Sequence, residues 1–206
     1  MCQSVRKSCL LVMVLLAVAS YSSCLQAAEG EGRFAIGVTY VNGFSDVEDF
    51  IENDLEAQGY TLDDTLSVPV GLTLVGGYRF ASGVEILADA GPFSMYYVDV
   101  ITGPVDEYTH WDLPVGLTAG YALLPDQSIS PYVRGGARYH FTGGDFADSS
   151  SVGPYVAAGI NFFSDREVQM QLEIAYDGST VDFVGLSGAT DEIETGGILA
   201  SLRIAF

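Results

Sequence analysis

The stretch Val168–Asp177 reads VQMQLEIAYD, and it decides the fold class of this 206-residue chain. Its even-numbered residues, from Val168 to Tyr176, are all apolar, whereas the odd-numbered residues are polar or small. A period of two is that of a β-strand whose two faces meet different surroundings. The end of the chain, from Gly197 to Phe206, has the same alternation. The sequence therefore predicts an all-β protein built from two-faced strands.

Eight segments of this kind follow one another: 33–44, 68–80, 84–100, 110–124, 131–142, 154–163, 168–178 and 195–206. Most are about as long as the roughly 9 to 11 residues that a tilted strand needs to cross the hydrocarbon core of a bilayer. Long connections (45–67, 101–109, 143–153 and 179–194) alternate with short ones. An even strand count with alternating connection lengths is typical of a transmembrane β-barrel that has its long loops on one side.

The hairpin around Ala81-Ser82-Gly83 tests the predicted register. With these residues as the turn, Phe80 faces Val84 and Arg79 faces Glu85. Apolar side chains then meet on one face and opposite charges meet on the other. A slip of one residue would destroy both matches, so the agreement supports the pairing.

Aromatic residues gather near the ends of the predicted strands. The expected edge beside the short turns carries Tyr78, Tyr121, Phe162 and Phe206, and the opposite edge carries Tyr40, Trp111, Tyr139 and Tyr176. Two aromatic girdles that flank an apolar band are expected of a barrel surrounded by lipid.

The first 28 residues are interpreted as a secretory signal peptide. Two basic residues precede an apolar run from Cys9 to Ala19, which is too short to span a bilayer as a helix, and small residues follow it. We therefore divide the chain into a cleaved segment, 1–28, and one barrel domain, 29–206. All three cysteines precede residue 25, so the mature barrel needs no disulfide. Lipoprotein processing at Cys24 is the alternative.

The charge of the chain excludes nucleic acid as a direct partner. It carries 27 Asp and Glu against 8 Lys and Arg, for a net charge of −19. Nucleic acid needs a basic footprint, which this chain lacks. Since 49% of the residues are hydrophobic, the chain is also no acidic disordered tail.

The final strand, Ser201–Phe206, reads SLRIAF. Together with the leader, the eight amphipathic strands and the alternating loops, it resembles the small outer-membrane β-barrel family of Gram-negative bacteria, with an eight-stranded, porin-like, OmpA-type membrane domain. The resemblance implies an outer-membrane location, contact with outer-membrane lipid and lipopolysaccharide, and a C-terminal Phe206 that is read by the barrel-assembly machinery.

The alternation turns charged side chains toward the barrel interior. They include the expected lumen network of Arg79, Glu85, Asp89, Arg134, Arg138, Glu173 and Arg203, together with Asp112 and Asp177. Charged side chains at membrane depth must be paired or hydrated. The interior of an eight-stranded barrel is only just wide enough for its own side chains. We expect a salt-bridged plug. A gated ion path is the alternative.

The first long loop, 45–67, carries eight carboxylates and no basic residue. Ser45 and Glu48 have the spacing of a capping box, which predicts a helix that ends near Gly59. Val47, Phe50, Ile51 and Leu55 form its apolar stripe. We expect the acidic loops to attract divalent cations loosely, without a dedicated metal site, because carboxylate oxygens suit Ca²⁺ and Mg²⁺. No cofactor is expected.

The two histidines of the chain, His110 and His140, are the candidates for a catalytic base. His140 and Thr142 share a strand face, but His140 also shares it with Arg134 and Arg138, so it points into the lumen. A nucleophile elbow of the form G-x-S-x-G does not occur in the sequence. The sequence therefore predicts a non-catalytic envelope scaffold or surface-interaction protein. A narrow channel for small solutes, a lipid-acting barrel enzyme and a soluble lipocalin-like barrel are the alternatives.

Overall fold

Antiparallel strands dominate the computed structural model, which describes residues 30–102, 107–125, 127–147 and 149–206. The elements in chain order are β1 (Gly30–Val41), α2 (Phe44–Ala57), β2 (Leu62–Val68), β3 (Val70–Phe80), β4 (Val84–Ala90), β5 (Ser94–Val100), β6 (Glu107–Ala122), β7 (Ile129–Gly144), β8 (Ser151–Phe162), β9 (Gln169–Asp177), β10 (Thr180–Val184), β11 (Thr190–Glu194) and β12 (Gly197–Ala205). The predicted leader, 1–28, lies outside the described residues.

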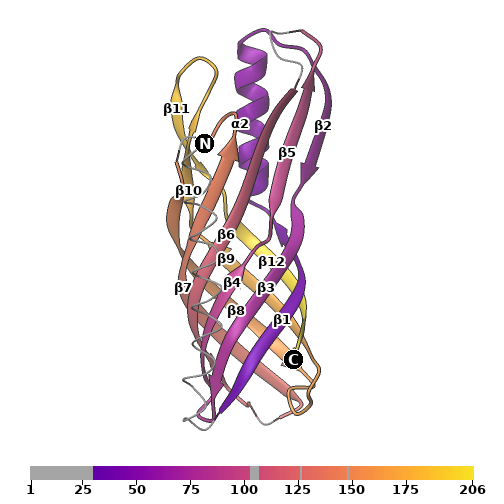
Figure 1. Ribbon diagram of the computed structural model, residues 1–206, viewed down its shortest axis with the longest axis vertical. Helices are drawn as coiled ribbons and strands as arrows, with labels where there is room; N and C mark the ends of the chain where they lie inside the picture. The colour runs from indigo at the N-terminus through magenta and orange to yellow at the C-terminus, as the bar shows by residue number, and fades with distance from the viewer. Residues whose placement is uncertain (1–29, 103–106, 126, 148) are drawn as a thin grey trace, which may run out of the picture.

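Eight of these strands close into a barrel. Around the wall the order is β6-β4-β3-β1-β12-β9-β8-β7, and β7 pairs back onto β6. The first and last strands meet where Ala35 faces Ala205 and Val41 faces Leu199. This confirms the predicted eight-stranded antiparallel up-and-down barrel with a short helix in its first long loop. Figure 1 shows the tilted strands of the closed part below the helix.

The alternation along the strands is the predicted one. In β9 the residues Leu172, Ile174 and Tyr176 are exposed, whereas Glu173 and Asp177 are buried. In the hairpin of β3 and β4, Arg79 faces Glu85 as expected. A belt of exposed apolar side chains circles the closed part of the barrel and includes Phe34, Ile36, Val38, Leu72, Leu74, Ile86, Leu117, Val133, Val156, Ile160, Ile198, Leu202 and Ile204.

One of the expected girdle residues, Tyr78, is buried, and two others, Phe162 and Trp111, are half-buried. Tyr78 is only 7% exposed and packs edge-on against the ring of Phe80, with 5.1 Å between centroids. At the same edge, Tyr121 and Phe206 are exposed as expected. At the opposite edge, exposed positions are held by Tyr40, Tyr139 and Tyr176, while Trp111 is half-buried and stacks on Phe93.

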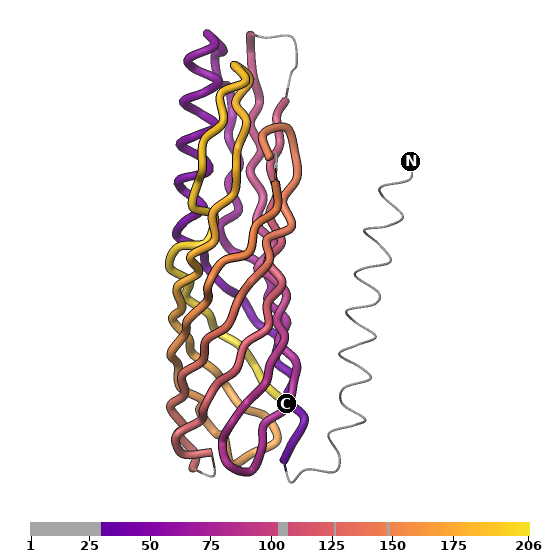
Figure 2. Tube along the Cα trace, turned by 90° about the vertical axis from the view of Figure 1, so that its left-hand side faces the viewer, coloured from indigo at the N-terminus to yellow at the C-terminus, as the bar shows by residue number. Residues whose placement is uncertain are grey.

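The wall continues above the closed barrel on one side only. There β5 pairs with the upper part of β6, and β2 pairs with β5. The hairpin of β10 and β11 rises beside α2 at the same end (Figure 2). The last long connection, expected as a loop, therefore contains a hairpin, and the first contains β2 as well as α2.

The predicted segment 84–100 is wrong as a single strand, because Gly91-Pro92-Phe93 divides it into β4 and β5. Gly91 has φ +97°, and a Cβ there would collide with the carbonyl oxygen of Leu72. The break shifts the face of the chain: even-numbered residues such as Ile86 point outward in β4, whereas Tyr96 points inward in β5. The other predicted strand boundaries lie within three residues of the observed ones.

Of the predicted stripe of helix α2, Val47, Ile51 and Leu55 are buried together with Phe44, while Phe50 is half-buried against the same cluster. The predicted capping box is wrong, because the helix begins at Phe44 after Gly43 and has no side-chain cap. Gly43 packs so closely on the link between β11 and β12 that a Cβ would clash with Gly196. The hydroxyl of Ser45 instead donates to the carbonyl of Asn42 at 3.0 Å. None of the helices in the described part of the chain is long and apolar enough to cross a membrane.

Candidate functional site

The lumen of the barrel holds nearly all the buried charge of the molecule, and it is the candidate functional site. All seven residues of the predicted lumen network are buried: Arg79, Glu85, Asp89, Arg134, Arg138, Glu173 and Arg203. Arg33, Asp112, His140 and Asp177 join them. These side chains form three groups that follow one another along the barrel.

The middle group is centred on Glu173 of β9. Its carboxylate pairs with Arg134 of β7 and with Arg203 of β12, the latter at 2.9 Å. Two tyrosine hydroxyls donate to the same carboxylate, from Tyr155 at 2.8 Å and from Tyr132 at 3.0 Å. One carboxylate thus ties together four consecutive strands, β12, β9, β8 and β7, which make up half of the wall.

The upper group contains Arg138, His140 and three aspartates. Arg138 pairs with Asp89 at 2.7 Å and with Asp177 at 3.5 Å. The imidazole of His140 lies between Asp112, 2.9 Å from Nδ1, and Asp177, 3.1 Å from Nε2.

Two further contacts secure this upper group. The hydroxyl of Ser179 donates to Asp177 at 2.5 Å. The guanidinium of Arg138 lies 4.0 Å from the ring centroid of Tyr155. Because Tyr155 also donates to Glu173, it joins the upper group to the middle group.

The lower group lies at the end with the short turns. Arg79 Nε pairs with Glu85 at 2.6 Å, which is the contact expected from the hairpin register. Both side chains are almost fully buried, whereas Glu31, 3.5 Å from Arg79, is 57% exposed. Beside the middle group, Thr39 shares hydrogen bonds of 2.8 Å with Thr73 and with Ser201, the residue that faces Glu173 in the sheet.

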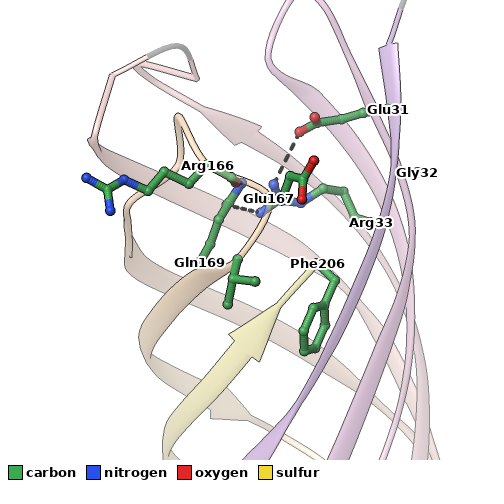
Figure 3. Close-up of a pocket in the computed structure, with 8 residues that line it drawn as sticks. Glu31, Gly32, Arg33, Arg166, Glu167, Gln169 and Phe206 are labelled. Carbon is green, nitrogen blue, oxygen red and sulfur yellow. Dashed lines mark hydrogen bonds and ion pairs between the residues drawn. The ribbon is translucent and has the colours of Figure 1, made fainter.

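A pocket of about 380 Å³ opens at this lower end. Figure 3 shows Arg33 between its two partners, Glu31 at 3.2 Å and Gln169 at 2.8 Å, while Arg166 points away. Glu167 also lines the pocket, so its positive and negative side chains balance. Arg33 and Gln169, both buried, line the pocket and hydrogen-bond to each other.

The upper end of the lumen is closed by apolar side chains. Phe44, Val47, Ile51 and Leu55 of α2 pack against the inner faces of β5, β6 and β10. The other members of this apolar plug include Val41, Tyr96, Val98, Val100, Tyr108, Phe146, Val181, Phe183 and Leu199. It is an apolar core above the charged groups, and it meets them at Tyr155, which belongs to the same cluster.

His110 of β6 lies within this apolar plug, one residue beyond Trp111 at the upper edge of the apolar belt. Its ring is 0% exposed and lies 4.8 Å from Phe183 and 6.4 Å from Phe44, measured between centroids. Burial lowers the pKa of His110 to about 4, which keeps the imidazole neutral at pH 7.

The residues that connect the buried lumen charges were not predicted from the sequence. Tyr132 and Tyr155 are inward by the same alternation, and this parity was the signal that could have found them. The alternation did not indicate the apolar plug, because the plug includes residues of β5, where the apolar side chains point inward and not outward as in β4. Within the described ranges, no group of three or more His, Cys, Asp or Glu is arranged to hold a metal ion.

Comparisons with known proteins agree with this architecture. The chain belongs to the family described as the outer membrane protein beta-barrel domain, whose model matches residues 10–206. It is therefore an integral β-barrel of the Gram-negative cell outer membrane. The long-loop end with α2 is extracellular, and the end with short turns faces the periplasm.

Two solved structures have the same fold. The outer membrane protein OprG from Pseudomonas aeruginosa is 14% identical with a TM-score of 0.55, and the match covers 87% of this chain and 98% of that one. The outer membrane protein AlkL is 15% identical with a TM-score of 0.52, covering 87% of this chain and 90% of that one. No functionally curated protein matches this chain.

Proposed function

We propose that this protein is a non-catalytic envelope scaffold and surface-interaction protein whose lumen is closed. The observation that carries the proposal is the double closure of the barrel. Charged side chains cross the lumen where Arg138 pairs with Asp89 of β4 and Asp177 of β9, strands on opposite sides of the barrel, and an apolar plug beneath α2 covers the upper end. A hydrated ion would have to displace paired charges and then pass through an apolar core, which is costly.

The extracellular end supports a role in surface interaction. Exposed carboxylates cover α2, β2 and the hairpin of β10 and β11, and they include Asp46, Asp49, Glu56, Asp63, Asp64, Asp182, Asp191 and Glu192. No Lys or Arg occurs in the four long connections. Such a surface attracts basic partners by long-range electrostatics and repels other acidic surfaces.

The surrounding lipid and lipopolysaccharide are the first partners of the proposed scaffold, through the apolar belt. Divalent cations would bind loosely between the extracellular carboxylates and anionic headgroups. At the periplasmic edge, the exposed ring of Phe206 ends the terminal strand, in keeping with a signal for the barrel-assembly machinery.

A catalytic role finds little support in the lumen. Both ring nitrogens of His140 are occupied by Asp112 and Asp177. The hydroxyl of Thr142 donates to the carbonyl of Ser149 and not to His140. A nucleophile needs an adjacent base within hydrogen-bond reach, and this pair does not provide one.

The alternative, a narrow channel for small solutes, is tested by conductance in planar lipid bilayers. We expect the purified protein to insert without discrete single-channel steps. The variant used for comparison carries both Glu173→Ala and Arg134→Ala, which together remove the central ion pair of the middle group. Its folding is checked by the gel mobility shift on heating. Regular unitary steps from the parent protein would overturn the closed-lumen proposal.

A further inference from the structure

His110 occupies the point where three elements of the extracellular part meet. It extends from β6 between Phe44, at the start of α2, and Phe183 of β10. Its opposite neighbours in the sheet are Tyr96 of β5 and Gly144 of β7. An ionisable ring thus lies inside the apolar plug that holds α2 in place.

The surroundings of His110 offer it no counter-charge. Neither Nδ1 nor Nε2 has a hydrogen-bond partner among the described residues. On the inner face of β6, Tyr108 is uncharged, and Asp112 is held by His140 at 2.9 Å. From β5, the Tyr96 hydroxyl donates to Glu52 at 2.7 Å.

The carboxylates of the covering elements are also directed elsewhere. On α2, Glu48 accepts from Ser67, and Asp54 accepts from the backbone N–H of Leu186. On β10, Asp182 is exposed beside Phe183. On the loop after β7, Asp145 accepts from the backbone N–H of Thr109. A proton on His110 would therefore leave a buried charge without a partner.

We propose that His110 is an acid-sensitive latch: its protonation releases α2 and the hairpin of β10 and β11 from β5 and β6. In the released state the imidazolium reaches water, while in the packed state it does not. Protons then bind preferentially to the released state and draw the equilibrium toward it.

The direction of the pH dependence follows from the lowered pKa. The packed state holds the pKa of His110 at about 4, below the ordinary value of 6.5. Well above pH 6.5 neither state takes up the proton, so the equilibrium does not change with pH. Between pH 6.5 and 4 the ratio of released to packed molecules rises by up to about tenfold for each unit of falling pH.

The closed barrel is independent of this motion, because its strands are held by a continuous ladder of hydrogen bonds. Opening the extracellular part breaks the packing of the apolar plug and a few hydrogen bonds such as that from Tyr96 to Glu52, but none of the barrel ladder, which makes it a local event. His140 provides an internal contrast. It is the only other histidine in the chain, and it already lies between two carboxylates.

The test measures the exposure of the buried face of α2. No cysteine occurs after residue 24, so Val47→Cys and Asn53→Cys can each place one thiol on the helix. Val47 is 0% exposed, and Asn53 lies on the outer face. The full-length protein is exported, purified from the outer membrane and reconstituted in lipid vesicles. Its reaction with 4,4′-dithiodipyridine is followed from pH 7.5 to 4.5, with the cysteine-free protein as background.

The quantity compared is the reaction rate at Val47→Cys divided by that at Asn53→Cys, which cancels the pH dependence of the thiol chemistry. We expect this ratio to rise about 20-fold between pH 7 and pH 5. Adding His110→Phe, which matches the surrounding rings, or His110→Gln should leave the ratio flat. Adding His140→Gln should leave the rise intact.

Three results would overturn the latch. One is a flat ratio in the protein with both histidines. Another is an unchanged rise in either His110 variant, and the last is loss of the rise in His140→Gln. Each variant is first checked for the gel mobility shift of a folded barrel. If His110→Phe fails that check, His110→Gln decides the outcome.

Discussion

Replacing Glu173 by Gln should destabilise the barrel more than any other single loss of charge in the lumen. The substitution keeps the size of the side chain but removes the carboxylate that pairs with Arg134 and Arg203. Two buried guanidinium groups then lose their shared counter-charge, and breaking a buried ion pair costs about 3–5 kcal/mol. The hydroxyls of Tyr132 and Tyr155 lose a charged acceptor as well.

The measurement is the free energy of unfolding by urea in lipid vesicles at pH 7. Glu31→Gln is the matched control, because Glu31 also contacts two arginines but is 57% exposed. An exposed pair contributes about 0–1 kcal/mol. If Glu173→Gln cost no more than Glu31→Gln, the charges of the middle group would be solvated and the lumen would be open to water.

Three further predictions concern the lipid face, the lower group and the acidic loops. Leu172→Arg, in the middle of the apolar belt, should cost about 2–4 kcal/mol, against about 0–1 kcal/mol for Val168→Arg at its edge. Equal unfolding free energies would contradict the assigned lipid face. A double-mutant cycle of Arg79→Ala and Glu85→Ala should show coupling, since removing one partner leaves the other buried and unpaired. Purely additive effects would mean that the pair is not in contact. EDTA should speed limited proteolysis within 45–67 and leave the strands protected, as read by mass spectrometry. Unchanged cleavage would remove the proposed role of divalent cations.

The closed barrel could be predicted from the sequence because lipid and lumen impose opposite demands on neighbouring residues. Leu172 must face hydrocarbon and Glu173 must face inward, so the alternation fixes both the strand and its orientation. The Arg79–Glu85 contact followed from the turn and the period of two. Both inferences use only residues that are neighbours in the sequence or in one hairpin. They hold wherever the barrel wall consists of regularly paired strands.

The extracellular part could not be predicted in the same way, because its pattern is inverted. In β5, Tyr96 and Val98 face inward while Asp99 faces outward, as in a soluble protein. A period of two shows that a strand has two different faces, but it does not show which face meets water. At Gly91 the chain passes from the barrel, where apolar side chains point outward, to the extracellular part, where they point inward. The role of His110 depends on Phe44 and Phe183, which lie far from it in the sequence.

The measurement that tests the central claim most directly is the accessibility of the lumen itself. Ser201→Cys places a thiol inside the lumen beside the middle group, next to Thr39 and Arg203. A charged methanethiosulfonate reagent, added on both sides of protein-containing vesicles, should fail to modify it, while Asn53→Cys reacts rapidly. Modification of Ser201→Cys at a rate close to that of Asn53→Cys would contradict a closed lumen.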